Sequence, residues 1–353
     1  FISKWPSLPD GDPVVGKTLG FCGAEFYFYG PCLHAYLHEM NRNCFGRGDK
    51  EYVTVGECGG LGIETAKLTT ADTRQELSMV FNFDHLDNAG HMRFDEYQYD
   101  LRKAVKTILK WQVEYTNHCW PTLLFENHDN PRVTSKVDPT DTYTPEIAKL
   151  CAVLEMTLKG SPFIFQGQEL GMTNTHFDSM DDVRDVESIN FYNKLVAKGK
   201  KSEKALRIIN GGSRDRGRTP MQWTSEPGAG FTDGTPWIGI NKNAVRVNAA
   251  DEAKVPDSVL NDFKRLIALR HANPALVYGD FTQLCPENKN VVCYKRTLDG
   301  NTFFVELNLT GKRQNRPYDP VGFERLYSNY HDHRDVLMPF EANVYLAEGE
   351  AKA

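Results

Sequence analysis

The sequence predicts an α/β protein with a parallel sheet, followed by a small antiparallel β domain. Three observations support this fold class. Short apolar runs alternate with helical stretches over most of the chain, two of these runs end abruptly in charged residues, and from about Ala275 the pattern changes to short β-rich runs between turns. Strands that alternate with helices form parallel sheets, because each helix carries the chain back to the start of the next strand.

The parallel part contains four predicted strands with helices between them. Apolar and β-branched runs place the strands at 52–57, 77–85, 121–126 and 162–165. Helices are expected at 33–40, 94–115 and 144–159, and the longest carries Leu101, Val105, Ile108 and Leu109 on one side, as an amphipathic helix does.

A long polar excursion follows the fourth strand. Residues 181–218 are charged and interrupted by glycine, with helical character near 188–196 and 204–209. Loops at the carboxyl ends of parallel strands commonly carry binding residues. Aromatic side chains beyond this excursion can stack on a sugar or plug the core, and the sequence leaves both open: Trp223, Phe231 and Trp237.

The C-terminal region has a different pattern. A helix at 258–271 is followed by β-rich runs at 291–294 and 302–307, which a turn at 298–301 connects. Short strands joined by tight turns are typical of antiparallel sheets. We therefore predict two domains, a parallel α/β domain over 1–274 and an antiparallel β domain over 275–353.

Two predicted strands end in acidic residues. The strand at 121–126 runs into His128, Asp129 and Arg132, and the strand at 52–57 ends in Glu57. The carboxyl ends of parallel strands meet at one edge of a sheet, so both carboxylates are expected at one cavity. Such a pair suits glycosidic bond cleavage, in which one acid protonates the leaving oxygen and another stabilises the cationic sugar.

Four motifs carry a family resemblance. They are Val55-Gly56-Glu57, Asn127-His128-Asp129-Asn130-Pro131-Arg132, the segment 165–174 and Arg218-Thr219-Pro220-Met221-Gln222-Trp223. In this order they resemble the α-glucosidase, oligo-1,6-glucosidase and sucrose isomerase branch of the α-amylase superfamily, glycoside hydrolase family 13. The resemblance runs along essentially the whole chain. It implies a (β/α)8 TIM barrel, of which the four predicted strands would be strands 5–8, the C-terminal half.

The resemblance also implies residue roles. Glu57 matches the general acid/base of strand 5, and Asp129 matches the strand 7 carboxylate that grips sugar hydroxyls and stabilises the transition state. His128 matches a histidine that contacts the sugar. Arg132 is expected to bind substrate beside Asp129, and a second interpretation has it pairing with a nearby acid to hold the loop. Both interpretations are compatible.

The nucleophile of the family does not occur in this sequence. It belongs to a Gly-Phe-Arg-x-Asp motif on strand 4, which in relatives is followed almost at once by a segment like residues 1–4. The chain is therefore expected to begin just past the nucleophile and to be inactive alone. Its expected partners are an α-glucoside substrate and the missing N-terminal half-barrel with strands 1–4.

The expected function is that of a retaining α-glucosidase acting on short glucosides such as maltose, isomaltose or a sucrose-like substrate. A sucrose isomerase or glucosyl transferase of the same family would share this machinery. A non-catalytic α-glucosidase-like subunit is a further alternative, which the presence of Glu57, Asp129 and His128 disfavours. The linkage specificity depends partly on residues beside strand 4, so the sequence does not decide it.

Composition excludes other classes of partner. The chain has 353 residues and a net charge of −6, which gives no basic surface for nucleic acid. No apolar run approaches the roughly 20 residues of a membrane-spanning helix. Eight cysteines without a C-x-x-C pair indicate reduced thiols, and a cytoplasmic location is expected.

No cofactor and no metal are expected in this chain. A family calcium site, if present, would lie in the missing N-terminal part. His34 and His38 are spaced i, i+4, as in some metal sites, but no third ligand is evident and a place on a helix surface is expected instead.

Overall fold

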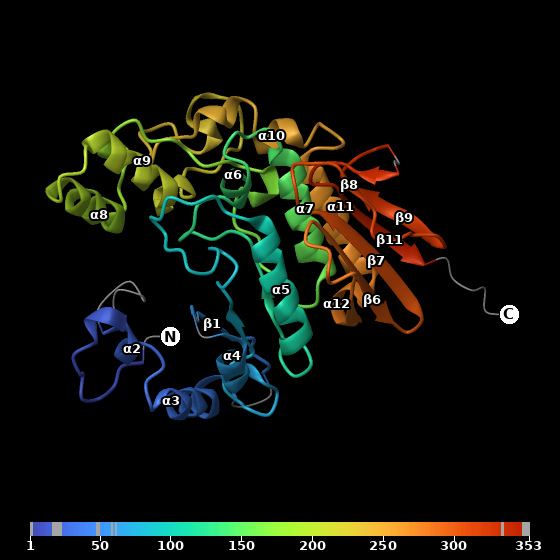
Figure 1. Cartoon of the computed structure of the whole chain (residues 1–353), viewed down its shortest axis with the longest axis horizontal. Helices are drawn as coiled ribbons and strands as arrows, with labels where there is room; N and C mark the ends of the chain where they lie inside the picture. Colours follow the sequence, from blue (N-terminus) through green and yellow to red (C-terminus); the bar gives the residue numbers. More distant parts are fainter. Residues whose placement is uncertain are drawn as a thin grey trace. The chain divides into compact units, whose positions relative to one another are not determined.

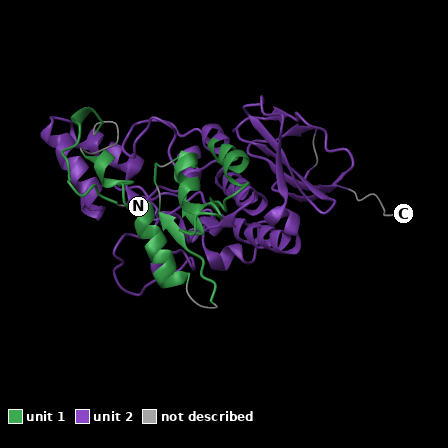
Figure 2. Cartoon of the chain, turned by 90° about the horizontal axis from the view of Figure 1, so that it is seen from below, with its two compact units in different colours: residues 1–85, 107–122 green, residues 86–106, 123–353 purple. Residues whose placement is uncertain are grey.

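The computed structural model describes residues 3–15, 23–46, 50–57, 59–60, 62–332 and 335–347. The chain forms two compact units, which Figure 2 shows in different colours. Unit 1 contains residues 1–85 and 107–122, and unit 2 contains residues 86–106 and 123–353. The predicted domain boundary at 274/275 falls inside unit 2 and stays a prediction.

Unit 1 is a small α/β assembly. Strand β1 (Val55–Glu57) pairs in parallel with β2 (Met79–Phe81), which confirms the parallel order predicted for this part of the chain. Its core packs Val80 of β2 against residues of α4, of α5 and of the turn after α5: Ile63, Ala66, Trp111, Tyr115 and Cys119. The helical elements are α2 (Ala24–Tyr27), α3 (Leu33–Met40), the π-helix η1 (Asn41–Phe45), α4 (Gly62–Thr70) and the later part of α5 (Leu101–Tyr115).

The predicted helix over 94–115 begins only at Leu101. The preceding segment is extended, because the side chain of Asn88 pairs with the backbone of Asp100 in both directions: Nδ2 donates to the Asp100 carbonyl at 3.1 Å, and Oδ1 accepts from its amide at 2.6 Å. The predicted strand over 77–85 is also shorter. It ends at Phe81, after which the Asp84 amide bonds Oδ1 of Asn82 at 2.8 Å and turns the chain.

Unit 2 has a buried helix at its centre. Helix α7 (Thr144–Thr157) is buried on nearly all sides, since it packs against α11 (Val259–Ala272), α12 (Pro274–Tyr278) and β11 (Ala342–Ala347). Its largely apolar sequence suits this position. Strands β3 (Thr122–Leu123) and β4 (Ser161–Pro162) form a small sheet, in which the Phe163 amide donates to the Leu123 carbonyl at 2.8 Å.

The excursion after β4 is helical, as its sequence predicts (Figure 1). Helices α8 (Val186–Ala197) and α9 (Ser202–Gly212) pack against each other, and short turns follow them. The other short helices of this unit are α6 (Val133–Val137), η2 (Gln168–Leu170), η3 (Met180–Asp182), η4 (Arg214–Arg216), η5 (Pro227–Gly230), η6 (Lys242–Val245) and α10 (Ala249–Glu252).

The C-terminal part is an antiparallel sheet, as predicted. Its five strands lie in the order β5-β6-β7-β11-β9, and a tight turn joins β6 to β7 with Leu298 opposite Asn301. Asp299 and Gly300 have φ values of 50° and 82°, the left-handed conformations that a two-residue hairpin needs. The strands of this sheet are β5 (Asp280–Leu284), β6 (Val291–Leu298), β7 (Asn301–Asn308), β9 (Phe323–Ser328) and β11. A separate antiparallel pair is formed by β8 (Gln314–Asn315) and β10 (Val336–Leu337).

Three further sequence-based expectations can be compared with the structure. Within the described ranges, no helix is both long and apolar enough to span a bilayer. Six cysteines are free thiols, while Cys22 and Cys58 lie outside the described residues. Trp223, Phe231 and Trp237 are all exposed, so none of them is part of the hydrophobic core of unit 2.

Candidate active site

Asp129 lies in a turn that follows the buried end of the β3 segment. Leu124, Phe125 and Glu126 are buried, and the chain then reverses at Asn127. Oδ1 of Asn127 accepts hydrogen bonds of 2.9 Å from the Asp129 amide and from Nδ2 of Asn130. This side-chain turn presents the Asp129 carboxylate, which is 29% exposed, beyond the end of an apolar segment.

Two arginines from the excursion hold the Asp129 carboxylate. Nη2 of Arg218 lies 2.8 Å from Oδ1 of Asp129, and Nη1 of Arg214 lies 3.2 Å from the same oxygen. Nε2 of His128 lies 3.6 Å from the other oxygen, Oδ2, and the His128 ring is mostly exposed. The three predicted residues Asp129, His128 and Arg132 therefore belong to one unit, and the structure brings the first two together.

Arg214 is itself fixed by a buried acid. Its Nη2 and Nε atoms lie 2.6 Å and 3.1 Å from Oδ1 of Asp185, which is also the N-cap of α8. Burial acts to raise the pKa of Asp185, but the hydrogen bonds from Arg214 and Ser188 outweigh it and the pKa falls below its ordinary value. A charge-assisted chain thus runs from Asp185 through Arg214 to Asp129.

Arg132 is buried, with 1% of its side chain exposed. Its Nη1 donates to Oε2 of Glu126 at 2.8 Å and to the Gln166 carbonyl at 2.9 Å, and its guanidinium lies over the Phe165 ring. This ion pair agrees with the second interpretation, in which Arg132 pairs with a nearby acid to hold the loop. Contact between Arg132 and a substrate stays a prediction.

Glu57 is the last residue of β1 and lies in unit 1. Its neighbour across the parallel ladder is Phe81, and the Glu57 residue is exposed. The carboxylate therefore stands at the carboxyl end of a parallel strand, as the sequence predicts. Because Asp129 belongs to unit 2, the convergence of the two carboxylates on one cavity stays a prediction.

The histidine pair at 34 and 38 has an acidic partner. Glu76, whose side chain is fully buried, lies 2.8 Å from Nδ1 of His34 and 3.1 Å from Nε2 of His38, and Nη2 of Arg74 donates to it at 2.6 Å. Although Nε2 of His38 lies close to Glu76, it makes no hydrogen bond, so this contact is an ion pair without hydrogen-bond geometry. In the described part of the chain, no group of three or more histidine, cysteine or acidic side chains is arranged to hold a metal ion.

Arg214, Arg218 and Asp185 were not identified from the sequence as site residues. Arg218 stands in one of the quoted motifs, but nothing in the motif assigns it to Asp129. The available signal was weak: a basic run at 214–218 within a loop at the carboxyl side of the strands. Such a loop is where partners of a strand-end acid are expected.

Comparisons with known proteins show which family the chain resembles. The profile of the α-amylase catalytic domain matches residues 1–279. An oligo-1,6-glucosidase of Halalkalibacterium halodurans is 36% identical over 99% of this chain and 64% of its own length. A trehalose-6-phosphate hydrolase of Escherichia coli is 38% identical over 87% of this chain and 56% of its own length.

A solved structure shows the same similarity in three dimensions. The isomaltulose synthase of Erwinia rhapontici superposes with a TM-score of 0.87 at 34% identity, covering 98% of this chain and 63% of that protein. The chain thus spans less than two thirds of the length of these relatives. It belongs to the α-amylase family, glycoside hydrolase family 13, among relatives named oligo-1,6-glucosidase, trehalose-6-phosphate hydrolase and isomaltulose synthase.

Proposed function

We propose that the protein to which this chain belongs is a retaining α-glucosidase that acts on short α-glucosides. The observation that carries the proposal is the Asp129 group. This strand-end carboxylate is preorganised, because Arg214 and Arg218 hold its Oδ1 and His128 flanks its Oδ2. Fixed charges of this kind stabilise a cationic sugar without reorganising during the reaction.

In this proposal Glu57 is the general acid and base. It protonates the leaving oxygen in the first step and activates water in the second, as retaining glycosidases require. Asp129 and His128 bind sugar hydroxyls, through contacts that tighten as the ring flattens in the transition state. Arg132 contributes to the site by holding the loop that carries Asp129, whether or not it also contacts substrate.

The nucleophile is proposed to come from outside these residues. No Gly-Phe-Arg-x-Asp motif occurs among the 353 residues, so the chain alone is expected to be inactive. We further propose that β1, β2, β3 and β4 are strands 5–8 of a (β/α)8 barrel, completed by an N-terminal half. A barrel of this kind would bring Glu57 and Asp129 to one mouth.

The test is hydrolysis by the complete protein. Wild type is expected to release glucose from isomaltose, maltose or sucrose. Asp129→Asn is expected to lose roughly 10²–10³-fold in kcat, because it removes a charge that stabilises the transition state. Asp178→Asn, which alters an exposed acid in the same unit, serves as the matched control. If the two variants retained equal activity, the assignment of Asp129 would be wrong.

The product distinguishes the alternatives. Relatives include an isomaltulose synthase, so sucrose is the informative substrate. Free glucose and fructose would indicate hydrolysis, a rearranged disaccharide would indicate isomerisation, and the absence of turnover by the complete protein would favour the non-catalytic subunit.

A further inference from the structure

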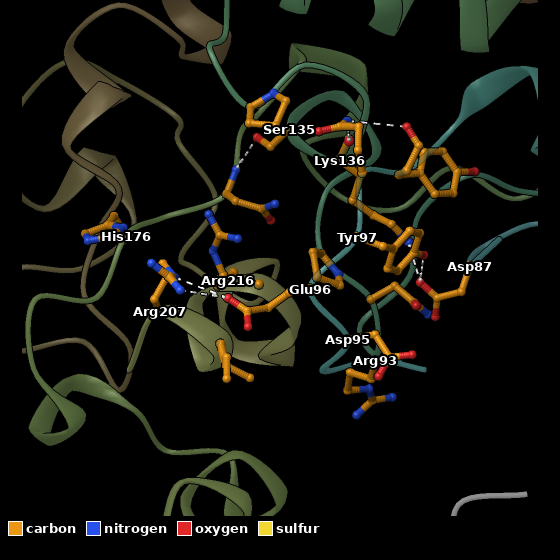
Figure 3. A pocket seen from close by; sticks show the side chains of 18 of the residues that line it. Asp87, Arg93, Asp95, Glu96, Tyr97, Ser135, Lys136, His176, Arg207 and Arg216 are labelled. Atoms are coloured by element: carbon orange, nitrogen blue, oxygen red, sulfur yellow. Dashed lines mark hydrogen bonds and ion pairs between the residues drawn. The ribbon is translucent and has the colours of Figure 1, made fainter. Parts of the chain in front are cut away.

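Unit 2 contains a pocket that the Asp129 group does not use. It has a volume of about 440 Å³ and lies between the segment before α5, the turn after Asp129 and the end of α9 (Figure 3). Among the described residues, Asn130 lines this pocket, whereas Asp129 and His128 do not. The pocket is therefore adjacent in the chain to the proposed catalytic carboxylate but has its own walls.

Paired polar groups hold one wall in place. Nζ of Lys136 lies 3.1 Å from Oδ1 of Asp87 and also bonds the Leu86 carbonyl, and the Tyr97 hydroxyl donates to the same Asp87 oxygen at 2.8 Å. The Tyr97 ring stacks on His91, with centroids 4.0 Å apart and planes within 8°. These contacts restrict the side-chain rotamers of Lys136, Asp87 and Tyr97. The pocket is therefore largely formed before a ligand binds.

The charges that line the pocket cancel. Four acidic and four basic side chains contribute to it: Asp87, Asp95, Glu96 and Asp141, and Arg93, Lys136, Arg207 and Arg216. The basic groups are already engaged. Lys136 pairs with Asp87, Nη2 of Arg207 lies 3.0 Å from Glu96, Arg93 lies 2.6 Å from Glu187, and Nε of Arg216 donates to the Thr175 carbonyl at 2.8 Å.

An electroneutral pocket of this kind disfavours an anionic ligand. A phosphate ester is recognised by cations in excess, with free donors that can reach its oxygens. Here a phosphate would instead meet carboxylates such as Asp95 and Glu96 at close range, and like charges in a pocket reject a ligand. Mixed donors and acceptors, including Asn130, suit a ligand whose groups both donate and accept, as sugar hydroxyls do.

We propose that this pocket binds one uncharged sugar unit and discriminates against phosphorylated sugars. The choice of a sugar rests on the proposed glycosidase function, while the selection against phosphate rests on the charge balance. The volume lies within the roughly 300–1,000 Å³ range of ligand pockets. The unit is either the far end of a longer α-glucoside substrate or a free sugar molecule.

A glycine provides a direct way to fill the pocket. Gly211 of α9 lines it, and a Cβ built there meets no atom within 4 Å. The Cβ of Gly211→Phe therefore meets no backbone atom, and its ring is expected to fill part of the pocket. Gly239, which is also exposed and also has open space around an added Cβ, lies outside the pocket lining, so Gly239→Phe is the matched control.

The first experiment measures binding, in crystals of the complete protein soaked with isomaltotetraose or with glucose, and by calorimetry with glucose and glucose 6-phosphate. Wild type and Gly239→Phe are expected to show a sugar in the pocket, and Gly211→Phe to lose that site with at least a tenfold weaker affinity. Glucose 6-phosphate is expected to bind the pocket at least tenfold more weakly than glucose. Sugar found only beside Asp129, or equal binding by both glycine variants, would overturn the proposal.

A second variant tests the charge argument without filling the pocket. Glu96→Gln removes one of the acids at a side chain that is 48% exposed, so the fold should tolerate it. The affinity for glucose 6-phosphate is expected to rise several-fold, with little change for glucose. If glucose 6-phosphate already binds wild type more tightly than glucose, the selection against phosphate is wrong.

Hydrolysis then separates the two sources of the sugar. If the pocket holds the far end of the substrate, Gly211→Phe raises the KM for isomaltotetraose but not for isomaltose; if it holds a free sugar, both values stay as in wild type. Sugar binding without any hydrolysis would refute the proposed function alone. Hydrolysis without sugar in the pocket would refute this inference alone.

Discussion

Nη2 of Arg218 lies 2.8 Å from Oδ1 of Asp129, and the Nε atom of the same guanidinium donates to the His128 carbonyl at 2.5 Å. One side chain therefore fixes both the carboxylate and the backbone of the residue before it. Since the guanidinium is planar, these two bonds also set the direction in which the turn presents Asp129. Arg214 approaches the same oxygen from the same excursion.

The first prediction concerns Arg218. Arg218→Lys keeps the charge but loses the planar pair of bonds, so Asp129 should be held less rigidly. We expect kcat/KM of the complete protein to fall on the order of 10²-fold, the usual cost of a small displacement of a reacting group. The exposed Arg313→Lys is the control. Unchanged kinetics in Arg218→Lys would show that the turn holds Asp129 without this bond.

The sequence predicted the strand-end acids but not their partners. Glu57 and Asp129 follow apolar runs directly, so local pattern is enough to find them. Arg214 and Arg218 are 85 and 89 residues away from Asp129 in the chain, within an excursion whose path depends on tertiary contacts. The late start of α5 has the same origin, since the Asn88–Asp100 hydrogen bonds override the helical pattern before Leu101.

The second prediction concerns Asp185. Its pKa in the folded protein lies below the ordinary value of 3.8, so it stabilises the fold fully above pH 3.8 and loses this contribution as the pH falls through the lower, folded value. Asp185→Asn should lower the free energy of unfolding at pH 7 by about 2 kcal/mol, because Arg214 loses a charged partner.

This difference between Asp185→Asn and wild type should shrink as the pH is lowered below 3.8. Urea unfolding at pH 7 and at pH 3 measures it, with Asp178→Asn as the exposed control. If Asp185→Asn were equally destabilising at pH 7 and at pH 3, the variant would act through packing and not through the charge of Asp185.

The third prediction concerns Glu57 in the complete protein. Glu57→Gln cannot protonate a leaving group, so hydrolysis of natural glucosides should fall by roughly 10²–10⁴-fold. Aryl glucosides carry leaving groups that need little protonation, and their rate should fall much less. Rates on isomaltose and on a nitrophenyl glucoside measure the difference. Equal losses on both substrates would exclude Glu57 as the acid.

The fourth prediction concerns a buried cation in unit 2. Arg296 is fully buried, which lowers its pKa to about 10, and it donates to the carbonyls of Leu276 at 2.8 Å and Gly279 at 2.7 Å. Arg296→Met leaves these carbonyls without this donor. Each carbonyl that stays unsatisfied should lower the free energy of unfolding by about 1–3 kcal/mol. Thermal unfolding should show a strong loss of stability, and the exposed Arg313→Met almost none. A near-neutral Arg296→Met would show that the carbonyls find other donors.

The last prediction rests on the edge of the β1–β2 sheet. Strand β1 pairs with β2, and among the described residues no other strand pairs with it. Apolar side chains stand along and just before this edge: Val53 is 75% exposed and Val55 is also exposed. Strands of parallel sheets are normally buried on both faces, and an open apolar edge is a template for association.

We therefore expect the isolated chain to self-associate, and a proposed N-terminal half-barrel to suppress this by pairing with the edge. Val55→Lys should reduce association, because Val55 is an exposed residue of the edge strand β1 and a charge on an edge strand opposes strand addition. Val321→Lys is the control, since Val321 is 80% exposed but lies outside the strands. Sedimentation velocity of the chain and both variants measures the effect. A monodisperse wild-type monomer that melts cooperatively would show that the edge needs no partner, and equal suppression by both lysines would attribute association to net charge instead.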